Sequence, residues 1–328
     1  NYERFNIQLN QNVKISKKLN LSFKTSYSPS VRTAPALLSF DLIAQKSRLH
    51  EIKTSDGKWL KHPEATGSGM NPIATASKDG GQELLKGSRI SGNLSLDYKI
   101  LPELKITGTY GIIQNQSRSR NYQKKITYYE QYNPEIIAAE TDYNILTINN
   151  ASDVLQNASL LTDYTKSIGD HNFMILAGLT AEWYEQQNDY VQTRDFLTDE
   201  IYTISAGTSD KTLWSISGAA ADWALASFIS RATHSYMDKY LFSGTLRYDG
   251  SSRFKEDLRW GIFPSASLGW ILSQEDFLKD NHVLTFLKLR GSWGQVGNQN
   301  VGYYPFANIL SQSAAYFNSS PQRSISTV

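Results

Sequence analysis

The sequence predicts an all-β protein, built as an antiparallel transmembrane β-barrel. Three observations predict it: long segments in which apolar and polar residues alternate, connections that alternate between short and long, and aromatic residues near the ends of those segments. A strand in the wall of a membrane barrel shows one face to lipid and the other to the interior, which produces the alternation. The 328 residues are therefore expected to supply about ten strands of such a wall.

Residues 89–98 show the alternation most clearly, with Ile90 and Leu94 at even positions and Ser91 and Asp97 at odd ones. The same pattern recurs along the chain. It predicts strands at residues 2–11, 17–28, 89–99, 103–115, 154–166, 171–187, 222–236, 240–250, 260–273 and 286–296. Many of these segments are longer than the roughly 5–6 residues of a usual globular strand. They are long enough for the roughly 9–11 residues that a transmembrane strand needs.

The connections between the expected strands fall into two classes. Short turns are expected near 16–18, 101–102, 168–170 and 237–239, with 274–285 as the longest of this set. Long loops are expected at 29–88, 116–153, 188–221 and 251–259. Successive connections of an up-and-down meander lie at opposite ends, so all short turns share one end and all long loops the other. This asymmetry is typical of outer-membrane barrels, with short periplasmic turns and long extracellular loops.

Aromatic residues follow the same division. Those that flank the short turns are Tyr98, Tyr164, Phe173, Tyr236 and Tyr240. Those toward the long loops are Tyr27, Trp183, Tyr248 and Trp293. The step from Tyr240 to Tyr248 covers roughly 26 Å of strand, or about 20 Å along the membrane normal at a tilt near 40°. This separation agrees with the apolar band of roughly 25 Å that lies between two aromatic girdles.

A soluble β-sandwich or an adhesin repeat would also alternate. In such a protein the apolar face forms a core, and the Gly and Ala residues of these segments would leave holes in it. One residue is awkward in either fold. Pro264 falls inside the expected strand 260–273 and cannot donate to a β-ladder, so it is expected near the start of the strand or at a bulge.

Composition excludes several other classes of protein. The chain has no Cys, which excludes a disulfide framework and a thiolate metal site. Its 33 Lys and Arg against 31 Asp and Glu give a net charge of +2, which provides no electrostatic case for nucleic-acid binding. Mean hydropathy is −0.42, and no run of about 18 apolar residues predicts a membrane-spanning helix. This hydropathy criterion does not detect barrel strands, because apolar and polar residues alternate along them.

Catalysis is not predicted. The five His residues show no metal-ligand spacing, there is no HExxH, and Gly67-Ser68-Gly69 lacks the spacing of a nucleophile elbow. We therefore expect no enzyme, no cofactor and no metal.

The most specific motifs lie between residues 247 and 299. Residues 247–254 read RYDGSSRF, residues 259–270 read RWGIFPSASLGW, and residues 287–299 read LKLRGSWGQVGNQ. Together they resemble a signature of the SusC/RagA-type TonB-dependent outer-membrane transporters of the Bacteroidota. Asp56-Gly57, Asn71-Pro72 and the strand start at 170–173 resemble the family more weakly.

The resemblance implies a larger protein. Members of the family carry a signal peptide, a carboxypeptidase-like extension, a TonB box, a plug domain and a barrel of about 22 strands. None of the N-terminal parts is expected in this chain, and both ends look like cuts. Ten strands would suffice for a small closed barrel, but these ends argue against it. Residues 1–328 are therefore expected to form part of one plugged barrel domain.

The resemblance also implies a function. The expected role is active import of an oligomeric nutrient, glycan or peptide, powered through TonB and capped by a SusD-like surface lipoprotein. A dimer of transporter–lid pairs is a further expectation. The alternative is a surface glycan-binding or adhesive β-protein without transport activity. An outer-membrane enzyme would need a compact His, Asp and Ser site on the rim, and the sequence shows none.

Candidate site residues follow from position in this scheme. Aromatic residues of the long loops are expected to contact substrate or else to pack the loops together: Trp59, Tyr128, Tyr129, Tyr132 and Trp214. Charged residues at inward positions are expected to line the lumen: Lys24, Asp97, Lys105, Arg247, Lys288 and Arg290. Residues 35–52 are expected to form a short amphipathic helix.

The motif residues are expected to shape the wall and its rim: Asp249, Gly250, Arg253, Trp260, Pro264, Trp270, Gly291 and Gly294. In this interpretation Asp249 bonds nearby backbone amides and Gly250 permits a positive φ. Arg253 pairs with Asp249, Glu256 or Asp257. Trp260, Trp270 and Trp293 face lipid, while Gly291 and Gly294 relieve crowding or admit close approach of the plug.

Overall fold

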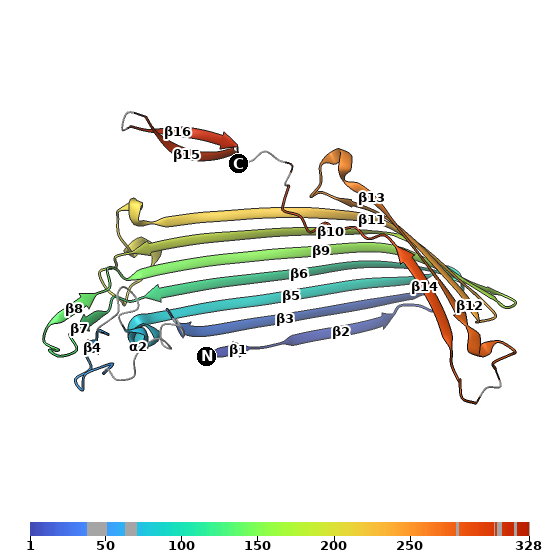
Figure 1. Cartoon of the computed structure of the whole chain (residues 1–328), viewed down its shortest axis with the longest axis horizontal. Helices are drawn as coiled ribbons and strands as arrows, with labels where there is room; N and C mark the ends of the chain where they lie inside the picture. The colour runs from blue at the N-terminus through green and yellow to red at the C-terminus, as the bar shows by residue number, and fades with distance from the viewer. Residues whose placement is uncertain are drawn as a thin grey trace.

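The computed structural model describes residues 1–37, 51–62, 71–279, 282–304, 306, 310–317 and 320–327. Its main body is one eleven-stranded sheet in which every neighbouring pair is antiparallel (Figure 1). The sheet consists of β1 (Tyr2–Arg4), β2 (Ile7–Lys14), β3 (Leu19–Pro35), β5 (Gly81–Lys99), β6 (Leu104–Gln123), β9 (Ile145–Ile168), β10 (His171–Arg194), β11 (Ser215–Tyr236), β12 (Tyr240–Ser251), β13 (Trp260–Ile271) and β14 (Lys288–Gly294). Strand order follows chain order, so the sheet is an up-and-down meander. It is a partial β-barrel wall, as the alternation predicts.

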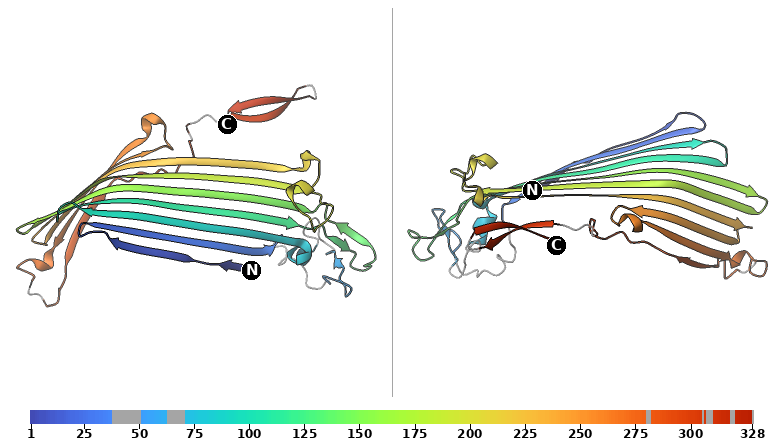
Figure 2. Two further views of the ribbon diagram at one scale, coloured as in Figure 1. Left: turned by 180° about the vertical axis from the view of Figure 1, so that it is seen from behind. Right: turned by 90° about the horizontal axis from the view of Figure 1, so that it is seen from above.

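The sheet is strongly twisted and curved. Figure 2 shows β12, β13 and β14 turning steeply away from β3 and β5, as expected of a wall that bends around a lumen. The connections after β2, β5, β9, β11 and β13 lie at one end, and those after β3, β6, β10 and β12 lie at the other (Figure 1). The first set consists of short turns except for 272–287, which is longer than the 252–259 loop of the second set. Among the described residues, no helix is long and apolar enough to cross a membrane.

The remaining elements lie mostly in the long connections. They are β4 (Trp59–Leu60), α2 (Pro72–Ala76), η2 (Lys78–Gly80), β7 (Thr127–Tyr129), β8 (Ile137–Glu140), η3 (Ile204–Ala206), η4 (Lys211–Leu213) and η5 (Glu256–Leu258). η6 (Leu272–Gln274) follows β13 at the turn end. β15 (Leu310–Phe317) and β16 (Ser320–Thr327) form a separate hairpin that the alternation did not predict.

The central strands run farther toward the loops than predicted. β5, β6, β9, β10 and β11 have 19, 20, 24, 24 and 22 residues. The connections are correspondingly shorter, covering 36–80, 124–144 and 195–214. The added stretch 116–123 is mainly polar, and the added stretch 145–153 has large apolar residues only near its start, at 145, 146 and 148. Backbone pairing continues in these stretches without a continuous apolar face, so the period-two signal ends before the strand does.

Two prolines show how the sheet tolerates a missing donor. The expected strand 2–11 is divided into β1 and β2 at Phe5, opposite Pro29. The Phe5 amide donates to the Pro29 carbonyl at 3.1 Å, and Pro29 has no N–H to return the bond.

Pro264 corrects the prediction made for it. It lies in the interior of β13, paired with Leu246, and neither begins the strand nor forms a bulge. Its carbonyl points away from β12 and accepts from the Gln295 amide at 2.9 Å, just past the end of the β13–β14 ladder. The amide N–H that Pro264 lacks would therefore point beyond the end of the β13–β14 ladder, where no ladder hydrogen bond is lost.

Register gives the sheet two distinct faces. Leu21 and Phe23 of β3 pair with Leu96 and Leu94 of β5, and this face continues across β6 to β14. The leucines of this outer face are exposed: Leu94, Leu179, Leu246 and Leu268 have relative exposures of 43%, 46%, 49% and 65%. An apolar face of this size, exposed along the whole sheet, is the surface that a bilayer covers.

Candidate functional site

The inner face of the sheet carries the predicted lumen residues. Register places Lys24, Asp97, Lys105, Arg247, Lys288 and Arg290 on the face opposite the exposed leucines. Lys105 pairs with Asp163 at 3.4 Å, and Asp97 accepts from the Thr107 hydroxyl at 2.7 Å. Lys288 and Arg290 border a hollow of about 820 Å³. The inner face of the sheet is therefore a polar wall.

Two rows of aromatic rings lie on the outer face. At the turn end, stacked rings with centroids 4.6 to 6.3 Å apart run across β10 to β13: Phe173, His234, His171, Tyr236, Tyr240 and Trp270. At the loop end, Tyr248 stacks on Trp260 at 4.7 Å, with Phe228 beside both. The register places Trp260, Trp270 and Trp293 on this face, in the manner of membrane girdles.

Glycine is needed at position 250 for a different reason from the one predicted. It lies within β12 and is not among the residues with positive φ. A Cβ at this position would lie 2.6 Å from the Trp260 ring, so glycine is needed to let the indole lie across the strand. Gly294 packs closely on Ser265, since a Cβ added to Gly294 would lie 2.9 Å from the Cβ of Ser265. Gly291 has open space and relieves no crowding with any described residue.

The polar motif residues also differ from the predicted pairs. Asp249 is held by the Arg247 guanidinium, with two contacts of 3.2 Å. Arg253 makes no ion pair with any carboxylate among the described residues. Its guanidinium lies between the rings of Trp223 and Tyr303, 5.2 and 4.8 Å from their centroids, and donates to the Val301 carbonyl at 2.7 Å. A cation between two rings replaces the expected salt bridge.

A compact loop module stands above the sheet at the end with the long loops. β4, β7 and β8 form a three-stranded sheet, and α2 packs beside it (Figure 1). Its small core consists of Ala74, Ile126 and Tyr128, with Trp59 and Ala139 packed against them. Loops that are distant in sequence are thereby joined into one unit.

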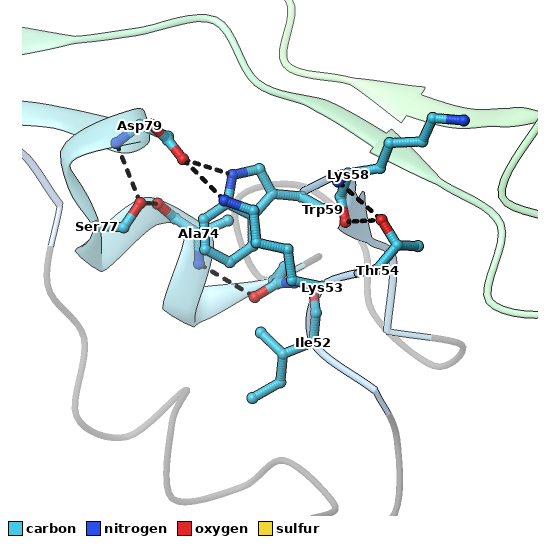
Figure 3. A network of polar contacts seen from close by, with 9 residues as sticks. Ile52, Lys53, Thr54, Lys58, Trp59, Ala74, Ser77 and Asp79 are labelled. Atoms are coloured by element: carbon cyan, nitrogen blue, oxygen red, sulfur yellow. Dashed lines mark hydrogen bonds and ion pairs between the residues drawn. The ribbon is translucent and has the colours of Figure 1, made fainter. Parts of the chain in front are cut away.

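Polar contacts fix the first half of this module (Figure 3). Asn71 caps α2: its side-chain oxygen accepts from the amides of Ile73 and Ala74, and Pro72 opens the helix. The Trp59 indole donates to Asp79 at 3.0 Å, and the Lys53 ammonium lies 4.2 Å from the Trp59 ring centroid. The Asn71-Pro72 pair thus begins α2, and Asp79 of the following η2 orients this aromatic residue.

A second cluster lies where β6, β9 and β10 end. Tyr122, Leu146 and Phe196 are buried together, and Tyr202 stacks on Tyr122 at 4.0 Å. The Tyr122 hydroxyl donates to Asp199 at 2.7 Å. Burial, with the neighbouring Asp199 carboxylate, raises the pKa of Tyr122 well above its ordinary value. The cluster fixes the base of the 195–214 loop.

The five loop aromatics have very different surroundings. Tyr128 is completely buried, and burial raises its pKa to about 12. Tyr129 is half-buried with the Lys58 ammonium 5.3 Å from its ring centroid, whereas Tyr132 is 88% exposed. Trp214 donates to the Thr208 carbonyl at 2.9 Å, beneath the Lys211 ammonium. Tyr128 packs the loops, and Tyr132 is the most accessible of the five. The expected helix at 35–52 lies largely outside the described residues.

Three aromatics at the loop end of the inner face were missed. Tyr184 stacks on Trp223 at 5.8 Å, and Tyr303 reaches the same place from the segment after β14. Trp223 shares the inner face of β11 with Leu225 and Ile229, whereas Tyr184 lies out of phase with most apolar residues of β10. That break in phase was the available signal. In the described part of the chain, no group of three or more His, Asp or Glu residues is placed to hold a metal.

Comparison with known proteins agrees with this architecture. The chain is 30% identical over 278 residues to the TonB-dependent receptor SusC of Bacteroides thetaiotaomicron, covering 80% of this chain and 24% of SusC. It is 25% identical to the TonB-dependent receptor P3 of Formosa agariphila, covering 96% of this chain and 31% of that receptor. The RagAB peptide importer in its closed-closed state superposes with a TM-score of 0.80 at 19% identity, over 99% of this chain and 36% of the importer chain. The chain is a β-barrel segment of the SusC/RagA type.

No family model matches the chain. The SusC/RagA-type chain spans about a quarter to a third of the length of the curated relatives it matches. It is an outer-membrane protein, and the relatives named above are receptors and importers. The open-open state of RagAB superposes almost equally well, with a TM-score of 0.79. The shared fold places the long strands of this chain in the barrel wall.

Proposed function

We propose that this chain forms part of the wall of a TonB-powered importer of oligomeric nutrients, glycan or peptide. The similarity in sequence to SusC, over 80% of the chain, carries the proposal. The outer face supplies the lipid contact and the inner face a polar passage lined by Lys24, Lys105 and Arg247. In this proposal residues 1–328 belong to one barrel domain, while the plug and the TonB box lie elsewhere in the gene product.

The test is uptake by cells that produce the protein as its gene encodes it. We expect oligosaccharides or oligopeptides to disappear from the medium in cells with the gene, and to remain when the gene or its TonB box is deleted. Immunoblots of the outer membrane establish equal protein levels. Surface binding that persists without TonB, with no depletion of either cargo, would support the alternative of an adhesive glycan-binding protein.

We also propose that the loop module contacts a SusD-like lipoprotein. Tyr132, Ile136 and Ile137 form the tip of the β7–β8 hairpin, with exposures of 88%, 52% and 56%. Neighbouring large apolar side chains at an extracellular tip are typical of a contact surface. Paired transporter–lid units remain part of this proposal.

Replacing Ile136 and Ile137 by Asp is expected to lower the amount of lipoprotein that copurifies with the transporter by about tenfold, because buried charges weaken an interface. The control is Ile168→Asp, which changes an isoleucine of 62% exposure at the opposite end of the sheet. Copurification is measured by quantitative mass spectrometry. Unchanged copurification of the double variant would exclude this hairpin as the contact.

A further inference from the structure

A pocket of about 410 Å³ lies at the loop end of the inner face. We call it the rim pocket and define it by Asp249, Ser251, Phe254, Arg259, Asn298 and Gln299. Its floor is the inner face of β11 to β13, and its walls are the 252–259 loop and the segment after β14. The volume lies within the range of small-ligand sites.

Both walls of the rim pocket are fixed in place. The Ser252 amide donates to the Ala224 carbonyl at 2.9 Å and the Ser252 hydroxyl accepts from the Ala224 amide at 2.9 Å, which pins the 252–259 loop to β11. Arg253 donates to the Val301 carbonyl, which holds the segment carrying Asn298 and Gln299. The pocket is therefore preformed, which lowers the entropic cost of binding.

The charges at the pocket leave one cation without a counter-ion. Asp249 is paired with Arg247 at 3.2 Å, and Asp257 with Lys255 at 3.5 Å. Arg259 makes no ion pair within the part of the chain that the structure describes. Its Nε donates to the Phe254 carbonyl at 3.3 Å, which fixes the side chain and leaves its terminal nitrogens for a ligand. A guanidinium held in this way favours a carboxylate, which it can bind in bidentate fashion.

Gln299 and Phe254 indicate which other groups the ligand carries beside its carboxylate. Gln299 lines the pocket, and its buried side-chain oxygen has no hydrogen-bond partner in the structure, so turning this amide toward a ligand hydroxyl supplies the missing donor. Phe254 offers an apolar ring beside these polar groups, suited to the C–H face of a sugar. A uronic acid residue carries the carboxylate, the hydroxyls and the C–H face on one ring.

A peptide fits the pocket less well. Extended peptides are recognised mainly by free backbone groups, and two backbone amides beside the pocket are already paired. The Ser251 amide donates to the Arg259 carbonyl at 3.1 Å, and the Gln295 amide donates to the Pro264 carbonyl. The side chains of Arg259, Gln299 and Phe254 match a ligand with polar groups around a ring, which favours such a ligand over a peptide.

We propose that the rim pocket is a subsite for a uronic acid unit of an acidic oligosaccharide. Arg259 binds the carboxylate, Gln299 accepts from a ring hydroxyl, and Phe254 covers the C–H face. This inference rests on the proposed import function and gives that function a substrate class.

The test measures binding to the protein as its gene encodes it, purified in detergent, by isothermal titration. The probes are oligogalacturonate, oligomannuronate, oligoguluronate and oligoglucuronate, each beside its methyl ester, and a hexaglutamate peptide. We expect at least one free uronate to bind about tenfold or more tightly than its ester, as a charge-assisted bond requires. Methyl esterification removes the charge and keeps the ring, so this comparison needs no variant.

Arg259→Gln is expected to abolish that preference, while Lys255→Gln retains it. Both changes remove one positive charge from the same loop, and Lys255 lies outside the pocket. Equal binding of acid and ester, failure of every uronate to bind, or an Arg259-dependent preference for hexaglutamate would overturn the proposal. Import that depends on TonB but is indifferent to Arg259→Gln would overturn the subsite and leave the import function intact. Loss of TonB-dependent uptake of every cargo would instead refute the import function.

Discussion

Leu94→Arg is expected to reduce the amount of protein in the outer membrane sharply, whereas Asn93→Arg is expected to leave it nearly unchanged. Leu94 lies on the outer face of β5, between Phe23 and Tyr110, and is 43% exposed. An arginine facing lipid near the middle of a barrel strand costs about 2–4 kcal/mol. The measurements are immunoblots of isolated outer membranes and urea unfolding of the protein refolded in liposomes.

Asn93→Arg is the matched control because it introduces the same side chain one residue away. Asn93 is exposed on the inner face, where it borders a polar hollow of about 340 Å³ that also contains Lys24. Water in such a hollow screens the added charge from Lys24. Leu94→Ala separates loss of the leucine from introduction of a charge. Equal damage from the two arginine variants would contradict the assignment of the faces.

The second large effect is expected at Tyr128 in the loop module. Tyr128→Ala removes a completely buried ring from a core of few residues. Truncating a buried aromatic costs about 3–5 kcal/mol, which such a small core cannot replace. We therefore expect residues 124–144 to exchange amide hydrogens much faster, while the strands of the sheet keep their protection. Hydrogen exchange read by mass spectrometry measures both regions in one sample.

Two neighbouring changes provide the controls for Tyr128. Tyr128→Phe removes a hydroxyl that has no partner in the structure, so exchange is expected to stay close to that of the unaltered protein. Tyr132→Ala alters a side chain that is 88% exposed and is expected to change the module's free energy of unfolding by less than about 0.5 kcal/mol. Fast exchange in Tyr132→Ala, or slow exchange in Tyr128→Ala, would show that the module depends on other contacts.

The alternation alone predicted the central parts of the main sheet's strands and which of their residues share a face. This succeeded because side chains of a strand alternate strictly between its two sides, and lipid and water select opposite chemistry. The meander followed from the lengths of the connections. The same signal failed at the loop end, where β9 and β10 continue without a continuous apolar face.

Contacts between distant segments were beyond reach of the sequence. Arg253 was expected to pair with a nearby carboxylate, but Trp223 and Tyr303 offer it two rings from other strands and segments. Gly250 was explained by backbone conformation, whereas the Trp260 ring across the loop is the reason for it. Local rules describe a residue and its neighbours in the chain, and these contacts depend on strand register and on segments that come from elsewhere in the chain.

The sequence was enough to predict a membrane barrel wall, the placement of its loops and turns at opposite ends, and the resemblance to SusC/RagA-type transporters. Those properties depend on strand period, connection length and contiguous motifs, all of which can be read along one dimension. Tertiary structure decided that Tyr128 is buried and Tyr132 exposed, and that Arg259 and Gln299 meet at one pocket. Burial and counter-ions are properties of three-dimensional neighbours, so two similar side chains four residues apart acquire different roles.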